Sequence, residues 1–125
     1  MVAYPAIIHE ENGAYWAEFP DMEGCFTNGG SVAETLENAA EALGMHVCSL
    51  YDRGIEVKSP TDIRSMEAPK DGFVSMVVAD PYKYKKDTRA VKKTLTIQAW
   101  LNKEAEKKGI NFSAALQKAL IALIQ

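Results

Sequence analysis

The chain has 125 residues, of which 25% are charged and 47% hydrophobic, a balance typical of folded domains. No apolar run reaches the roughly 18 residues that a membrane span needs, and the N-terminus lacks the basic segment of a signal peptide. The two cysteines, Cys25 and Cys48, lie far apart without metal-ligand spacing. We therefore expect a cytoplasmic protein without membrane segments, with reduced thiols and with no metal or other cofactor.

The net charge of −3 conceals two oppositely charged parts. Residues 1–80 contain four basic and 14 acidic residues, a net charge of −10, whereas residues 81–125 contain ten basic and three acidic residues, a net charge of +7. An acidic part attracts basic proteins and repels nucleic acids, and a basic part does the reverse. The charge distribution therefore predicts two parts with different partners.

Residues 1–80 are predicted to form a β-β-β-α-β unit of the α+β class, a small antiparallel sheet with one packed helix. Apolar or alternating runs indicate strands at residues 3–8, 14–19, 24–27 and 73–79. Ser31 and Glu34 form a capping-box pattern, and apolar residues then recur every three or four positions up to Arg53, before Gly54. This spacing predicts a helix whose apolar face covers the sheet.

The last part of the chain is predicted to be strand-helix-helix. Residues 81–89 form a basic linker, and residues 90–125 form a second domain. Its strand spans residues 91–97, its first helix spans residues 99–108 and ends at Gly109, and Asn111 caps a second helix that runs to the C-terminus.

Such a segment is too small to be stable alone, because a single strand has no partner for its backbone groups. A two-fold dimer solves this problem by pairing the two strands above four helices. The paired ribbon would present Lys92, Thr94 and Thr96 to the DNA major groove, with Lys93 adding salt-sensitive attraction and Asn111 placing a helix start near a phosphate. The alternative is an ordinary helical hairpin docked with its strand on the first part.

A series of short motifs follows in order along the first 80 residues: Glu11, Gly13, Tyr15, Phe19-Pro20-Asp21, Gly24-Cys25, Thr27, Gly29, Glu34, Asn38-Ala39 and Glu41-Ala42. This pattern resembles the HicB antitoxin family of type II toxin–antitoxin systems. The tail, KKTLTIQAWLNKEAEKKGINFSAALQKAL, resembles the ribbon-helix-helix domain that some members carry, although they often have proline where this chain has Gln98.

The resemblance implies a partial RNase H-like first domain, and an antitoxin that blocks a HicA-type ribonuclease toxin and represses its own operon as a dimer or higher oligomer. The candidate toxin contacts are acidic: Glu10, Glu11, Asp21 and Glu23. These carboxylates do not follow the order of a metal-binding set, so we expect no enzyme and no catalytic residue. The alternative function is a stand-alone ribbon-helix-helix transcriptional regulator whose first domain senses a ligand or a protein, and a third reading is an RNA-processing enzyme.

Overall fold

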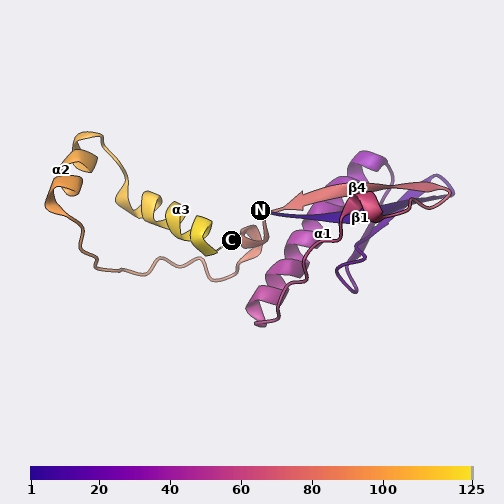
Figure 1. Cartoon of the computed structure of the whole chain (residues 1–125), viewed down its shortest axis with the longest axis horizontal. Helices are drawn as coiled ribbons and strands as arrows, with labels where there is room; N and C mark the ends of the chain where they lie inside the picture. Colours follow the sequence, from indigo (N-terminus) through magenta and orange to yellow (C-terminus); the bar gives the residue numbers. More distant parts are fainter. Residues whose placement is uncertain (125) are drawn as a thin grey trace. The chain divides into compact units, whose positions relative to one another are not determined.

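The computed structural model describes residues 1–124 and divides the chain into two compact units, Met1–Asp87 and Thr88–Gln125. In Figure 1 the first unit contains the sheet and the long helix α1, and the second contains the two short helices α2 and α3. The first unit carries a net charge of −8, because it includes three lysines and one aspartate of the predicted linker. The second has seven basic and two acidic residues, a net charge of +5.

The first unit is built on a four-stranded antiparallel sheet with the order β3-β2-β1-β4. Its strands are β1 (Val2–Glu11), β2 (Ala14–Glu18), β3 (Phe26–Gly29) and β4 (Gly72–Ala79). Asn12 and Gly13 connect β1 to β2, and both have a positive φ, 52° and 78°. Two such residues in a row match the twist of a tight hairpin, so the predicted hairpin is confirmed.

The helix α1 (Val32–Asp52) has both predicted end signals. At its start, the Ser31 side chain accepts a hydrogen bond from the Glu34 amide at 3.1 Å. At its end, Gly54 has a φ of +66°, its amide donates to the Tyr51 carbonyl, and the Ile55 amide donates to the Leu50 carbonyl. This pair of bonds is the Schellman motif, which glycine permits without steric cost.

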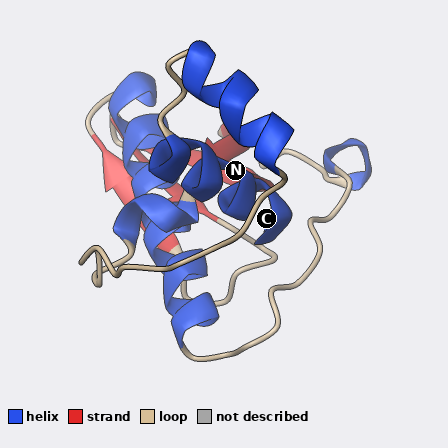
Figure 2. Ribbon diagram, turned by 90° about the vertical axis from the view of Figure 1, so that its left-hand side faces the viewer, coloured by secondary structure: helices blue, strands red, loops and turns tan. Residues whose placement is uncertain are grey.

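The core lies between α1 and one face of the sheet, which form two layers (Figure 2). The apolar stripe of the helix supplies Ala39, Leu43 and Val47, all with no exposed surface. They meet alternate residues of β1 and β2, among them Ile8 and Ala17, which are also fully buried. The predicted α+β arrangement with one packed helix is therefore confirmed for this unit.

The third strand begins two residues later than predicted. The amide of Cys25 donates to the Met22 carbonyl, and the Cys25 carbonyl accepts from the Phe19 amide, so a tight turn holds this stretch. Gly24 also has a φ of +81°, which a strand does not adopt. Its φ and these bonds place Gly24 and Cys25 in the turn, and pairing with β2 starts at Phe26.

A short 3-10 helix, η2 (Pro81–Tyr84), occupies the start of the predicted linker and packs on α1. The rings of Tyr82 and Tyr51 lie 5.6 Å apart, and Lys85 forms an ion pair with Asp52 at 2.6 Å. Gly44 makes room for Tyr84, because a Cβ there would lie 2.5 Å from the tyrosine ring. Residues 81–87 therefore belong to the first unit, and the linker is shorter than the predicted 81–89.

The second unit contains α2 (Ala99–Lys107) and α3 (Phe112–Ile124), which agree with the predicted helices over the described residues. A second Schellman motif, with Gly109 at a φ of +66°, ends α2. Residues 91–97 form no strand in the described chain. A β-strand needs hydrogen-bonding partners, and the single chain does not provide them here.

None of the described helices is both long enough and apolar enough to cross a membrane.

Candidate functional site

The segment 91–97 has two chemically different faces. Lys93, Leu95 and Ile97 line an apolar hollow of about 520 Å³, which is completed by both helices of the second unit, with Leu101, Phe112 and Leu116 among the lining residues. Lys92, Thr94 and Thr96 alternate with these positions, do not line the hollow and are exposed. The structure thus separates Lys93 from the other three predicted DNA contacts.

The second unit buries almost none of its apolar surface. None of residues 88–124 is buried, and only Asn102, Ala105 and Leu116 are half-buried. Trp100, predicted to point toward a core, is 63% exposed, and Phe112 is 44% exposed. A unit without a buried side chain lacks the hydrophobic stabilisation that folding requires, so a partner surface must cover these residues.

Asn111 lies at the start of α3, as predicted. Its Oδ1 accepts a hydrogen bond from the Ala114 amide at 3.1 Å, and its carbonyl accepts from the Ala115 amide at 3.0 Å. The preceding amides of this first turn have no helical acceptor and point out of the helix, where the dipole favours an anion. At the start of α2, Gln98 makes no capping bond and instead accepts from the Trp100 indole at 2.6 Å.

The predicted acidic contacts fall into two groups. Glu10, Glu11 and Glu23 are exposed. Asp21 is not, since its side chain is only 1% exposed. Its carboxylate accepts hydrogen bonds from the Thr61 amide at 2.8 Å and from the Thr61 hydroxyl at 2.6 Å. The expectation of a toxin contact is thus wrong for Asp21, whose oxygens are committed within the fold.

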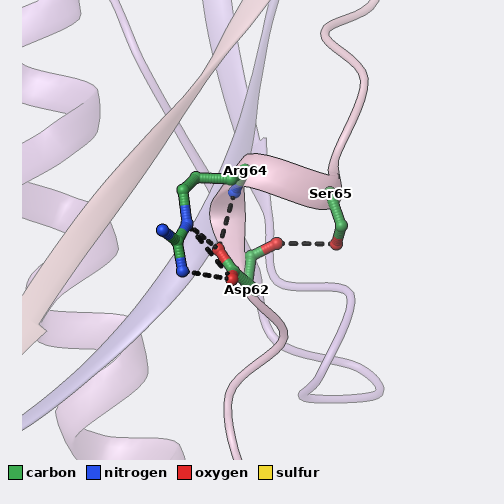
Figure 3. A network of polar contacts seen from close by, with 3 residues as sticks. All are labelled: Asp62, Arg64 and Ser65. Carbon is green, nitrogen blue, oxygen red and sulfur yellow. Dashed lines mark hydrogen bonds and ion pairs between the residues drawn. The ribbon is translucent and has the colours of Figure 1, made fainter.

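Asp21 is one of several attachments of the long segment between α1 and β4. The Tyr4 hydroxyl donates to the Lys58 carbonyl, and a short 3-10 helix, η1 (Ile63–Ser65), follows Thr61. Asp62 accepts from the Arg64 amide at 2.9 Å and from its guanidinium at 2.8 Å, and Ser65 donates to the Asp62 carbonyl (Figure 3). Because the Asp62–Arg64 pair is exposed, it orders the local backbone more than it stabilises the fold.

The side chains with catalytic potential in the first unit are not arranged as a reaction centre. Cys25 is buried, and this burial raises the pKa of its thiol to about 11. His9 stacks on Trp16 at a centroid distance of 3.9 Å and lies 3.3 Å from Glu18. Among residues 1–124, no three His, Cys, Asp or Glu side chains come together in a way that could hold a metal ion.

Sequence and structure comparisons agree on one family. The family described as "HicB_like antitoxin of bacterial toxin-antitoxin system" matches residues 4–120. A toxin–antitoxin complex from Streptococcus pneumoniae contains a similar chain, with 31% identity, 97% coverage of both chains and a TM-score of 0.64. The HicA3 and HicB3 toxin–antitoxin complex gives 30% identity over 64% of this chain and 100% of that one, with a TM-score of 0.54.

Two further similarities are consistent with this result. The chain is 31% identical over 80 residues to an uncharacterised 14.9 kDa protein of Haemophilus phage HP1, a match that covers 62% of this chain and 60% of that relative. The antitoxin HicB of Burkholderia pseudomallei, at 18% identity and full coverage of both chains, shares the fold with a TM-score of 0.60. Because the family match spans most of the sequence, this chain belongs to the HicB-like antitoxin family.

Proposed function

We propose that this protein is a cytoplasmic antitoxin whose first unit binds and blocks a HicA-type ribonuclease toxin and whose second unit dimerises and represses its own operon. The observation that carries the proposal is the contrast between the two units. The first has a complete core and a net charge of −8, whereas the second is basic and leaves its apolar residues uncovered.

Toxin binding is supported by the similar chains found in two toxin–antitoxin complexes. A HicA-type toxin is a small basic ribonuclease, and an acidic domain attracts such a partner over long distances. Glu10, Glu11 and Glu23 are exposed and available for this attraction. Charges at the rim of an interface raise the association rate more than the affinity, so apolar contacts must supply most of the binding energy.

Dimerisation would complete the second unit. Two copies of segment 91–97 would pair as an antiparallel ribbon, while the apolar hollow behind Leu95 and Ile97 would receive side chains of the second copy. The outer face of the ribbon would then carry Lys92, Thr94 and Thr96 from each chain. A two-stranded ribbon fits the major groove, where lysine donates to guanine and threonine bonds to bases or touches a thymine methyl.

Two further residues would contribute to backbone contacts. Asn111 orients the first turn of α3, whose amides can bind a phosphate oxygen. Lys93 starts on the side of the segment that lines the hollow, so we assign it to charge attraction along the backbone and not to base reading.

Removal of residues 88–125 tests the division of labour. The shortened chain retains the sheet, α1 and η2, so it should bind the toxin encoded by the adjacent reading frame with unchanged affinity. It should no longer shift operator DNA, and it should lose dimerisation through the tail. Binding of operator DNA by the shortened chain, or loss of toxin binding together with intact circular dichroism, would contradict the proposal.

A further inference from the structure

The face of the sheet opposite α1 is apolar, and no element of the first unit is shown packed over its centre. The strand registers align two rows across it. One row runs from Phe26 through Glu18 and Ile7 to Val74, and the next contains Trp16 beside His9. Along β4, Met76 and Val78 continue the same face, because their neighbours Val77 and Ala79 are buried on the α1 side.

Several of these side chains are exposed although they are large and hydrophobic. Phe26 is 70% exposed, Val78 51% and Met76 42%, while Trp16 and Ile7 are half-buried. In a four-stranded sheet with one helix, one face must either be polar or be covered by something else. The polar alternative does not apply here, since Glu18, His9 and Asn28 are the polar side chains among these rows.

The charges on and beside this face select the kind of partner. Glu18 lies on the face, and Glu10, Glu11 and Asp71 lie at the end where β1 turns into β2 and β4 begins. The pocket at this end has His9 and Trp16 in its wall and includes a single lysine, Lys70. An acidic border repels nucleic acid and favours a basic protein, even though exposed aromatic side chains on a sheet could otherwise stack with bases.

We propose that this sheet face, with Phe26, Trp16 and Met76 as apolar anchors and Glu18 and Glu11 as its acidic border, is the surface on which the basic toxin docks; this rests on the proposed antitoxin function. Four strands about 4.8 Å apart and roughly five residues tall give a face of roughly 20 Å by 17 Å. That is the size of the apolar centre of a standard interface, in which a few aromatic and apolar side chains supply most of the affinity.

The stacking of His9 on Trp16 gives this surface a rigid part. The two rings are nearly parallel, with an interplanar angle of 10°, and Glu18 lies 3.3 Å from the imidazole. An aromatic side chain that is already held in place loses little conformational entropy on binding. The mobile part of the face is Phe26, which has the largest exposed fraction and lies on the edge strand β3.

The experiment compares two methionines on opposite sides of the first unit. Met76 lies on the proposed surface and Met45 on α1, and their exposures are similar, 42% and 52%. The full-length chain carrying Met76→Lys, which adds a charge of the same sign as the toxin, should bind the toxin encoded by the adjacent reading frame about tenfold or more weakly. Met45→Lys should bind within about twofold of wild type, as expected for a position outside the interface.

A second pair of variants separates surface chemistry from folding. Phe26→Thr retains a strand-forming residue and removes the aromatic ring, so it should weaken toxin binding while the melting temperature stays unchanged. Met76→Glu should weaken binding less than Met76→Lys, because it removes the apolar contact but not the charge complementarity. Binding is measured by calorimetry, and circular dichroism verifies that each variant is folded.

The outcomes are distinguishable. If the wild-type chain does not bind the toxin, both the function and the surface are wrong. If it binds, and Met76→Lys matches wild type or Met45→Lys loses as much affinity, the antitoxin function stands and the docking surface is overturned. The docking surface is also overturned if the sheet variants lower the oligomeric state or RNA binding of the full chain and leave toxin affinity unchanged.

Discussion

Replacement of Asp21 by alanine should destabilise the first unit, because this buried carboxylate attaches the segment after α1 to the rest of the domain. The side chain accepts two hydrogen bonds from Thr61, at 2.8 and 2.6 Å, and Lys58 lies 3.8 Å away. A hydrogen bond to a charged group contributes roughly 1.5–3 kcal/mol. We take the lower end for both bonds, because Thr61 is exposed and its freed donors can bond to water. The exposed Lys58 adds little.

The expected loss for Asp21→Ala is therefore about 3 kcal/mol, which lowers the urea midpoint by about 2 M for a domain of this size. Asp21→Asn keeps one acceptor oxygen and should lose about half as much. Urea unfolding is followed by the fluorescence of Trp16 in a Trp100→Phe background, so that the signal comes from the first unit alone. Glu23→Ala, an exposed acid in the same turn, is the matched control and should change stability by less than about 0.5 kcal/mol. The reasoning fails if Asp21→Ala is as stable as this control.

Two further predictions concern the DNA-binding surface and the thiols. The double variant Thr94→Ala, Thr96→Ala should lose discrimination between operator and random DNA by roughly 1–3 kcal/mol per base contact in a competition shift assay, while Thr88→Ala should not; an equal loss on both DNAs would move the threonines to a packing role. Cys25, with a pKa of about 11, is almost fully protonated at pH 8, so its alkylation by iodoacetamide should be much slower in the folded protein than in urea; equal rates by mass spectrometry would contradict its burial.

Local signals in the sequence predicted most of the first unit correctly. The Ser31 cap, the Gly54 end and the Asn12-Gly13 hairpin act over four or fewer residues, so their outcome depends little on the remainder of the chain. The boundary of β3 was missed because the turn at Gly24 and Cys25 is closed by backbone bonds to Phe19 and Met22, which leave no compositional trace. The packing of η2 was missed for a similar reason, since PYKYKK is polar enough to resemble a linker.

The candidate sites divide in the same way. Alternation along segment 91–97 separated Thr94 and Thr96 from Leu95 and Ile97, and the hollow behind the latter pair agrees with that separation. Lys93 shares the side of the apolar pair, a position that the same alternation already implied. The acidic residues could not be sorted by sequence, because burial depends on which distant donor lies opposite, and only Asp21 has Thr61 beside it.

The sequence by itself determined the family, the sign of charge on each part, the ends of the helices and the alternation of the tail, because all of these are local or compositional properties. The tertiary structure alone decided that Asp21 is an internal anchor, that residues 81–87 belong to the first unit, and that Phe26, Trp16 and Met76 share one uncovered face. These features depend on strand register and on contacts between residues up to 40 positions apart, which no short window of sequence contains.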